Sequence, residues 1–376
     1  MQRELIGRGR FVSTHDYRGL AFIGDPHLSS RVPGFRRDDY PRTALAKLKF
    51  CLETALEQRL LPVLLGDVFD RPRDNANWLI GELLDLLSRD EVLAIYGNHD
   101  CRENSLTDDD SFSILLKSGH VRLLTPEFPW QGTINGQHVI VGGSPWGQPV
   151  PDCYPENACE QTTLFSVEQL GPEDEPDEDS LVIWVTHHDL RTSPEMQTGI
   201  KPDERRGIDI VINGHLHKRQ DPIVTGKTTW LIPGNLTRLG RSETSRTQPP
   251  AFLRVDIEPD AWQSEYVEIP HEPFDNVFFE AAKAPELDGL ESSFVRGLAE
   301  LQAHRTESGA GLVYFLEQNL PGIEEPIAQE VLSLAELVTG QSIHVDFSAE
   351  GLSLKTGPVP GPAGENDTPG RQQALF

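Results

Sequence analysis

Six short apolar runs organise residues 20–235, and each is followed by turn residues and a polar cluster. The runs lack the alternation of half-exposed strands, which is the pattern of strands buried on both faces of a sheet. The runs are LAFIG (20–24), LLPVLLG (60–66), VLAIYG (92–97), LVIWVT (181–186), IDIVING (208–214) and TTWLIPG (228–234). We therefore predict six buried strands in this part of the chain.

Between the first three runs, apolar residues recur at helical spacing. One set is Leu45, Leu48, Leu52, Ala55 and Leu56, and the other is Leu79, Ile80, Leu83, Leu84 and Leu87. Strands that alternate with helices predict an α/β fold with a largely parallel sheet. The segment GTINGQHVIVGGSPW (132–146) predicts a hairpin around Asn135 and Gly136, so we expect mixed sheets flanked by helices.

The sequence changes character beyond about residue 245. Residues 249–270 predict two strands around a turn, and residues 290–302, 310–320 and 326–338 have helical spacing. The end of the chain is rich in Gly and Pro, which is typical of disorder. We expect a main domain over 1–270, a small, mostly helical accessory region for capping or partner binding over 271–340, and a flexible tail over 341–376.

The chain is strongly acidic, with 59 acidic and 33 basic residues among 376 and a formal net charge of -26. This charge argues against a protein that coats nucleic acid electrostatically. It does not exclude a nucleic-acid enzyme, because bound cations and local arginines can reverse the sign at a site. Residues 173–179 hold six carboxylates and predict a solvated insertion loop.

Cysteine content and hydropathy bear on the compartment. Four cysteines are too few for a disulfide framework and none forms a CxxC pair, so we predict free thiols in a reducing compartment. The chain has no 18 successive apolar residues, and its start lacks the apolar segment of a leader peptide. The expectation is a cytoplasmic protein without a membrane partner.

Polar clusters with metal-ligating side chains stand at the ends of the predicted strands. They are Asp25 and His27 in GDPH, Asp67 in GDVFD, Asn98, His99 and Asp100 in GNHD, His187 and His188 in THHD, and His215 and His217 in GHLH. The carboxyl ends of parallel strands meet at one edge of a sheet, so these residues should converge. Each cluster alone is an ordinary turn, and the prediction of a metal site depends on the ordered set.

The side-chain chemistry of the set indicates the kind of metal. Imidazoles with carboxylates and one amide, without a thiolate, suit Mn, Fe or Zn better than a structural zinc site. Seven ligands drawn from these clusters would exceed what one ion needs. They would suit two ions that share a carboxylate. Two ions about 3.5 to 4 Å apart can clamp a phosphate and activate a bridging water. In THHD, we take His187 as the ligand and His188 as its neighbour.

The motifs DxH, GDxxD, GNHD, HH and GHxH occur here in the order found in the calcineurin-like metallophosphoesterase superfamily, which the chain resembles over about residues 20–240. The segments GDVFDRPRDNANWLIGELLDLL and LIPGNLTRLGRSET are similar to the branch of SbcD-type DNA repair exonucleases and phage recombination endonucleases. The resemblance implies a four-layer metallophosphoesterase core as the catalytic domain. It also implies manganese as the metal, with Fe²⁺, Zn²⁺ or Mg²⁺ as alternatives.

The resemblance further implies a role for each residue. Asp25, His27 and His217 would hold one ion, Asn98, His187 and His215 the other, and Asp67 would bridge them. His99 would assist catalysis as a proton donor or by stabilising charge. Asp100 would orient His99, and an ordinary role in a turn or helix cap is an equal alternative.

Basic residues beside the ligand motifs bear on the substrate. We predict substrate contacts for Arg31, Arg36, Arg37, Arg71, Arg102 and Arg238, with solvated loop charge as the alternative. Phe35, Tyr40 and Trp146 are predicted either to stack on bases or to pack in the core.

The resemblance favours a two-metal nuclease of the SbcD type that cleaves DNA in repair or recombination. It implies an SbcC-like coiled-coil ATPase as a partner, and a homodimer is a further expectation. One alternative is a phosphatase or phosphodiesterase acting on small phosphorylated molecules or a phosphoprotein, because the metal site alone does not select the substrate. A second alternative is a non-catalytic metal-binding scaffold in a DNA-processing complex.

Overall fold

The computed structural model describes residues 16–33, 36–154, 180–192 and 198–279, together with the backbone of residues 342–348 and 351–357. The chain divides into two compact units, Met1–Glu280 and Ala281–Phe376. The division lies ten residues beyond the predicted boundary at residue 270. The added segment packs on the first unit, since Val277 and Phe278 are buried and the Arg37 N–H donates to the Val277 carbonyl at 2.8 Å.

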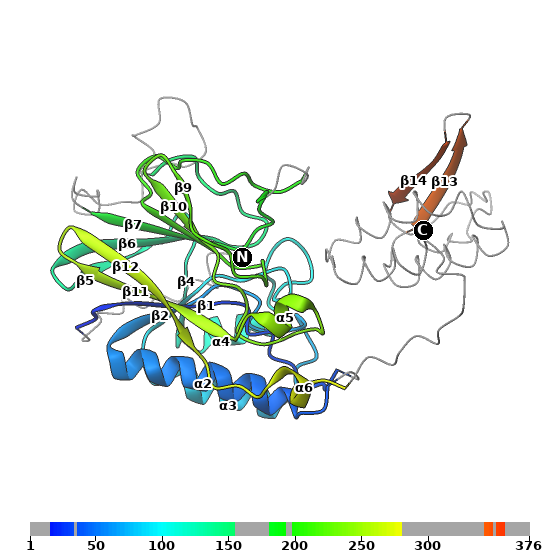
Figure 1. Ribbon diagram of the computed structural model, residues 1–376, viewed down its shortest axis with the longest axis horizontal. Coiled ribbons are helices and arrows are strands. Elements are labelled where there is room, and N and C mark those ends of the chain that lie inside the picture. The colour runs from blue at the N-terminus through cyan, green and yellow to red at the C-terminus, as the bar shows by residue number, and fades with distance from the viewer. Residues whose placement is uncertain are drawn as a thin grey trace, which may run out of the picture. The chain divides into compact units, whose positions relative to one another are not determined.

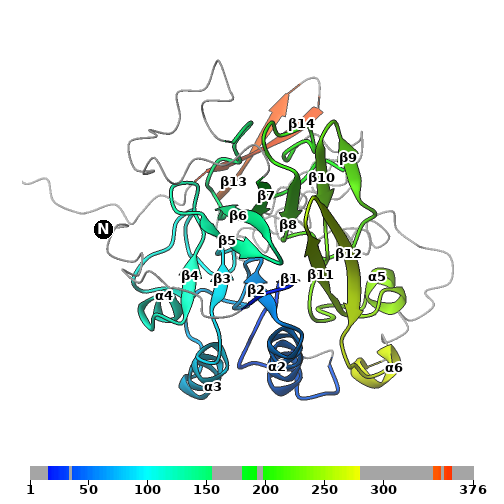
Figure 2. The same cartoon turned by 90° about the vertical axis from the view of Figure 1, so that its left-hand side faces the viewer.

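The first sheet of this unit has six strands in the order β12-β11-β1-β2-β3-β4. Their bounds are β12 (Ala261–Glu268), β11 (Ala251–Glu258), β1 (Gly19–Ile23), β2 (Leu60–Leu64), β3 (Val92–Ala94) and β4 (Val121–Leu123). Strands β1 to β4 run parallel, whereas β11 and β12 are antiparallel to their neighbours. Helices α2 (Tyr40–Gln58), α3 (Asn77–Leu87) and α4 (Phe112–Lys117) cover one face of this sheet (Figures 1 and 2).

The second sheet also has six strands, in the order β5-β6-β7-β8-β10-β9. Their bounds are β5 (Trp130–Ile134), β6 (Gln137–Ser144), β7 (Leu181–Thr186), β8 (Ile210–Asn213), β10 (Thr228–Leu231) and β9 (Ile223–Thr225). The four central strands are parallel, and the edge strands β5 and β9 are antiparallel. The predicted hairpin is confirmed, with Asn135 and Gly136 at φ 49° and 88° in its turn.

The main core lies between the two sheets, where Phe22 and Val63 of the first sheet join Val141 and Ile183 of the second in one buried cluster. A second cluster fills the space between the first sheet and its helices. Trp184 and Trp230 anchor a third cluster on the other face of the second sheet. The predicted fold class is therefore confirmed as two mixed sheets with flanking helices.

Helix α2 shows which helical predictions hold. It starts after Asp39, whose side chain accepts the Arg42 N–H, and ends at Arg59 in the left-handed region, with φ 56°. Four of its five predicted core residues are buried, but Leu56 is 39% exposed. Lys47 and Cys51 lie on the buried face instead. The apolar spacing thus predicted the helix correctly, but it was wrong about Leu56 and did not predict the burial of Lys47 and Cys51.

Parts of the C-terminal prediction lie outside the described residues, including the three predicted helices, and so does the acidic insertion at 173–179. The second unit contains an antiparallel hairpin of β13 (Ser342–Ser348) and β14 (Gly351–Gly357). This hairpin stands where the sequence predicts a flexible tail, and the structure differs from the prediction there. Two short helices, α5 (Glu243–Thr247) and α6 (Phe274–Val277), complete the described elements.

The cysteine prediction needs a correction. Cys51 and Cys101 are free and buried, as expected, but Cys153 is disulfide-bonded. The prediction of free thiols is therefore confirmed for Cys51 and Cys101 and wrong for Cys153. Among the described residues, no helix is both long and apolar enough to span a membrane.

Candidate metal centre

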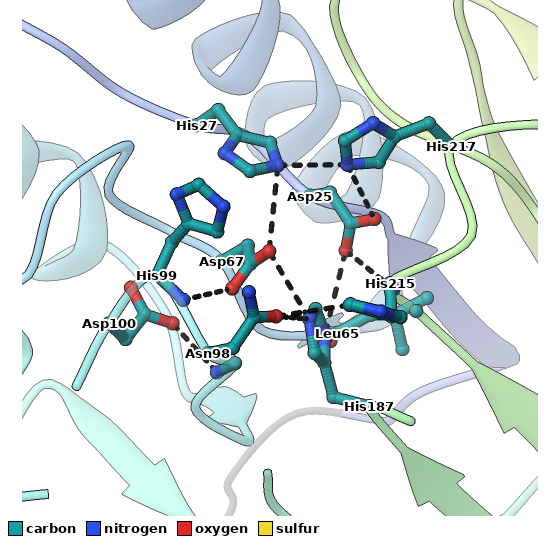
Figure 3. Close-up of polar contacts among 12 residues, drawn as sticks. Asp25, His27, Leu65, Asp67, Asn98, His99, Asp100, His187, His215 and His217 are labelled. Atoms are coloured by element: carbon teal, nitrogen blue, oxygen red, sulfur yellow. Dashed lines mark hydrogen bonds and ion pairs between the residues drawn. The ribbon is translucent and has the colours of Figure 1, made fainter. Parts of the chain in front are cut away.

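The predicted ligands converge at the carboxyl ends of strands from both sheets (Figure 3). The first sheet supplies Asp25 and His27 after β1, Asp67 after β2, and Asn98 after β3. The second sheet supplies His187 directly after β7, then His215 and His217 after β8. Residues up to 192 positions apart in the sequence therefore meet in one site, as expected for the edge of a parallel sheet.

Local backbone conformation aims these side chains inward. Asp25, His27, Asp67 and His215 have φ of 37°, 44°, 47° and 67°, a left-handed region that residues other than glycine seldom adopt. Such strain clusters at functional sites, where the surrounding structure imposes it. Gly97 allows a close approach, because a Cβ there would lie 2.1 Å from Asp67 Oδ1.

One half of the centre is formed by His27, His217 and Asp25. The Nε2 atoms of His27 and His217 face each other at 3.1 Å. His217 Nε2 lies 3.9 Å from Asp25 Oδ2, and His27 Nε2 lies 3.6 Å from Asp67 Oδ2. The lone pairs of two imidazoles and two carboxylates thus point into one small volume.

The other half is formed by His187, His215 and Asn98. His187 Nε2 lies 3.2 Å from both Asp67 Oδ2 and Asn98 Oδ1. The Nδ1 of His215 lies 3.0 Å from the same Asn98 oxygen. Asp67 Oδ2 therefore stands between the two halves, which is the place predicted for a bridging carboxylate.

The donor set fits divalent cations. Asp25 Oδ2 is buried and accepts no hydrogen bond from the part of the chain that the structure describes, and Asp67 Oδ2 is buried with imidazole nitrogens of His187 and His27 at 3.2 and 3.6 Å. Buried carboxylate oxygens without donors are costly unless a cation compensates them. Three groups have ligand atoms within 4.8 Å of one another: Asp25, His27 and His217; Asp67, His187 and His215; and His27, Asp67 and His99.

Electrostatics at the site follow from burial and close opposite charges. Burial raises the pKa of Asp25 above its usual range. Burial would also raise the pKa of Asp67, but the neighbouring His187 and His27 outweigh it and hold that pKa below its usual range. Burial lowers the pKa of His187, and the Asp67 charge more than reverses this effect and raises it to about 9. The same attraction would favour divalent cations in place of protons.

Further contacts hold the imidazoles in place. His187 Nδ1 donates to the Leu65 carbonyl at 2.7 Å, which leaves its Nε2 directed at Asp67. His215 Nε2 lies 3.0 Å from Asp189 Oδ1, so a carboxylate orients this ring. Sequence reasoning missed Asp189, although its place two residues after His187 in THHD was an available signal. The ring of Trp146 stacks on His188 at 6.2 Å and approaches His215 at 5.3 Å.

His99 and Asp100 lie beside the bridging carboxylate. The backbone N–H of His99 donates to Asp67 Oδ1 at 2.9 Å, and its ring Nδ1 lies 2.8 Å from the Asp70 carbonyl. The buried Asp100 carboxylate accepts the backbone N–H groups of Val68, Phe69 and Gly97. The contacts of Asp100 are thus with the two loops that carry Asp67 and His99, and any orienting effect on His99 passes through these loops.

Two of the six predicted substrate arginines are structural. Arg36 is buried, pairs with Asp38 through two contacts of 2.8 Å, and donates to the Arg238 carbonyl. Arg238 is also buried and donates to the carbonyls of Ser245 and Glu272. Their guanidinium groups are engaged within the protein, so the structure corrects the prediction that they contact substrate.

The other four predicted arginines are exposed. Arg37 packs over Phe279 at 5.4 Å, whereas Arg31, Arg71 and Arg102 make no ion pair with any described residue. These three follow the ligand motifs of β1, β2 and β3 in the sequence. Of the predicted stacking residues, Tyr40 is buried and donates to the His27 carbonyl at 2.8 Å, and Phe35 lies outside the described residues.

Two mixed sheets with clustered Asp and His ligands at their common edge define a class of metal-dependent hydrolases. The family model for calcineurin-like phosphoesterases matches residues 20–219, which is more than half of the chain. The protein therefore belongs to the calcineurin-like phosphoesterase family, and it is a metal-dependent phosphoester hydrolase.

No curated protein matches the sequence. Solved structures similar to this chain include TT1561 of Thermus thermophilus, at 12% identity and TM-score 0.36, covering 66% of this chain and 99% of that one. A hypothetical protein from the same organism has 14% identity and TM-score 0.36, covering 67% and 99%. GAP50, the anchor in the inner membrane complex of Plasmodium, has 12% identity and TM-score 0.36, covering 66% and 84%. Sequence identities and TM-scores as low as these carry no argument about function.

Proposed function

We propose that the protein is a nuclease of the SbcD type that hydrolyses phosphodiester bonds in DNA with two divalent ions, Mn²⁺ first among them. The motif resemblance described above supports this proposal. The structural observation that carries it is the set of exposed arginines, Arg31, Arg71 and Arg102, in loops that follow the ligands. On a chain of net charge -26, local cations without ion pairs among the described residues suit a polyanionic backbone.

The proposal assigns seven ligands. Asp25, His27 and His217 would hold one ion, Asn98, His187 and His215 the other, and Asp67 would contact both. Bound divalent ions supply Lewis acidity and lower the pKa of a coordinated water. The protein contributes fixed ligand positions, because five of its strands and their turns set them.

The proposal gives His99 the role of assisting departure of the leaving oxygen. Its Nδ1 can donate to the Asp70 carbonyl, which lies 2.8 Å away and fixes the ring orientation. Nε2 is then the nitrogen that would give a proton to the leaving oxygen, or stabilise its charge, in the imidazolium form.

Substrate would approach from the side of the loop after β8. The side chains of His217 and His215 are 36% and 12% exposed, whereas those of Asp25, Asp67 and His187 are fully buried. The neighbouring Lys218 is also exposed and makes no ion pair among the described residues. A phosphate therefore reaches the centre over the rim formed by this loop.

The test is Mn²⁺-dependent degradation of end-labelled single- and double-stranded DNA, with a phosphodiester and a phosphomonoester reporter assayed in parallel. His99→Ala serves as the site variant, and His120→Ala is the matched control because His120 precedes β4 at the opposite end of the sheet. We expect cleavage of DNA and of the diester, with loss in His99→Ala and retention in His120→Ala. Dependence on His99 excludes a contaminating nuclease.

Other results would assign other functions. Turnover of the monoester alone would favour a phosphatase for small phosphorylated molecules, which the acidic net charge suits. Bound metals without turnover of any substrate would favour a scaffold, or a nuclease that needs an ATPase partner. That partner stays a prediction, because most of the predicted accessory region lies outside the described residues.

A further inference from the structure

Trp146 stands in the loop after β6, beside the half of the metal centre that is formed by His187, His215 and Asn98. The centroid of its ring lies 5.3 Å from that of His215 and 6.5 Å from that of His187. Its ring plane is inclined by 34° to the ring of His215 and by 29° to the ring of His188. A large aromatic ring therefore lies directly beside two of the predicted ligands.

Contacts with the loop after β3 hold Trp146 in place. Its backbone N–H donates to the Tyr96 carbonyl at 3.0 Å, and its indole Nε1 donates to Asn104 Oδ1 at 3.3 Å. Tyr96 and Asn104 flank the GNHD motif. The next residue, Gly147, has φ 77°, and a Cβ there would lie 2.5 Å from the Asn104 carbonyl oxygen. Because the ring is already held, it loses little conformational freedom when a ligand packs against it.

Packing in the core accounts for only part of the Trp146 side chain. The residue packs against the cluster between the first sheet and its helices, but it is only partly buried. In contrast, Trp184 and Trp230 are 1% and 0% exposed. The neighbouring ligand His215 also keeps a 12% exposed side chain, at the rim over which a phosphate would approach. Trp146 therefore offers aromatic surface next to the exposed side of the centre.

Stacking is the interaction that this surface offers to a nucleic-acid substrate. A nucleobase is joined to its phosphate through one sugar, so a nucleotide with its phosphate at the centre carries its base nearby. Aromatic side chains bind bases through their π faces, whichever base is present. Of the three aromatic residues near the ligand motifs, Tyr40 is buried and Phe35 lies outside the described residues. Trp146 is the remaining candidate for this contact.

We propose that Trp146 stacks on a nucleobase of the substrate and makes the site selective for nucleotides over phosphodiesters without a base. The inference rests on the proposed nuclease function and adds to it a contact that distinguishes nucleic acid from other phosphodiesters. Arg102, two residues before Asn104, is exposed, and its charge suits a neighbouring backbone phosphate. Because stacking involves no hydrogen-bond pattern, we expect little preference among the four bases.

The experiment compares two oligonucleotides of equal length that differ only in their bases. One is oligothymidylate, and the other is its abasic analogue, with a tetrahydrofuran ring in place of each thymidine. Phosphorothioate linkages in both slow hydrolysis, so calorimetry can measure their dissociation constants with the Mn²⁺-loaded full chain. The Mn²⁺ affinity of each variant is measured in the absence of oligonucleotide.

Three variants separate stacking from packing. Trp146→Ala removes the proposed contact, and Trp146→Phe keeps an aromatic ring. Trp262→Ala is the matched control, because Trp262 is also partly buried against a core cluster. Trp262 pairs with Ile257, whose N–H donates to the Arg18 carbonyl at 3.1 Å, at the end of β1 away from Asp25. Its replacement therefore tests for a general loss of packing at a place remote from the metal centre.

We expect the wild type and Trp262→Ala to bind oligothymidylate more tightly than the abasic analogue. Trp146→Ala should weaken oligothymidylate binding by about 5- to 150-fold, as expected for loss of one stacked base, and leave binding of the abasic analogue unchanged. Trp146→Phe should keep part of the preference.

Equal binding of both oligonucleotides by the wild type would overturn the proposal, however the variants fold. An equal loss for both oligonucleotides in Trp146→Ala would also overturn it, because the ring would then only support the ligands.

Hydrolysis of unmodified DNA is measured separately, so failure of this inference and failure of the nuclease proposal are distinguishable. A preference for the oligonucleotide with bases that is lost in Trp146→Ala, without hydrolysis of DNA, would reject the nuclease proposal and support the base contact. Hydrolysis of DNA with equal binding of both oligonucleotides would reject the base contact alone.

Discussion

Replacement of Asp100 by alanine should destabilise the fold and the metal centre together. The carboxylate is fully buried and accepts three backbone N–H groups, from Val68 at 3.2 Å, Phe69 at 2.9 Å and Gly97 at 2.9 Å. The first two donors belong to the loop that carries Asp67, and the third precedes Asn98. The side chain therefore ties together two loops that supply ligands to the centre.

The magnitude follows from the donors that alanine would leave without a partner. A buried donor that loses its acceptor costs about 1 to 3 kcal/mol. Water that enters the vacated space would recover part of this cost, so we expect a loss of about 3 to 6 kcal/mol in the free energy of unfolding. Such a loss is a large share of the typical stability of about 5 to 15 kcal/mol. Asp100→Asn keeps one acceptor oxygen and should fall between wild type and Asp100→Ala.

Urea denaturation followed by tryptophan fluorescence measures the stability, and Mn²⁺ titration calorimetry measures the affinity of the centre. Asp108→Ala is the control, since the Asp108 side chain is 59% exposed and pairs with Lys117 on the surface. A stability loss below about 1 kcal/mol for Asp100→Ala would refute the account, because it would mean that the three donors find partners elsewhere. Loss of stability with unchanged Mn²⁺ affinity would refute the connection to the metal centre.

Three further predictions concern single residues. Asp67→Asn should abolish hydrolysis and reduce metal content at both sites, as measured by elemental analysis of dialysed protein, and full turnover would disprove the bridging role. His99→Ala should keep both metals and lose about 10²- to 10⁴-fold in rate, whereas metal loss would make His99 a ligand. Lys47 has a pKa of about 8, below its usual 10.5, because of burial and then the charges of Arg238 and Arg36, with Asp38 opposing them. Between these two values the unfolded chain binds a proton that the folded chain does not, so unfolding free energy should rise with pH over this window. Lys47→Met should flatten this rise in urea denaturation, and the same slope in both proteins would contradict the assignment.

The sequence predicted the strands of this fold well because burial on both faces leaves a local signature. The run at 181–186 became β7 without a change in bounds, and the run at 60–66 contains β2. Strand β4, at Val121–Leu123, escaped prediction because three residues are too few to show a pattern. Its position is set by pairing with β3, which is a contact between distant parts of the chain.

The ligands of the candidate site were predictable because their motifs stand in the turns that directly follow the strands. All seven predicted ligands meet at the same edge, because neighbouring parallel strands bring the turns at their carboxyl ends together. The contacts that orient them were not predictable, since the Leu65 carbonyl against His187 is a backbone group with no side-chain signature. Burial of Arg36 and Arg238 depends likewise on packing against Tyr40, Phe278 and the segment after β12, which spacing along the chain does not reveal.

Because the ligands are divided between the two sheets, bound metal ions would link the sheets to each other. Asp25, His27, Asp67 and Asn98 belong to one sheet, and His187, His215 and His217 to the other. Each proposed ion would take ligands from both, so its binding free energy adds directly to the cohesion of the sheets. Loss of the metal ions would then weaken the packing of the two sheets as well as abolish hydrolysis. The metal-free protein would be the form most susceptible to proteolysis.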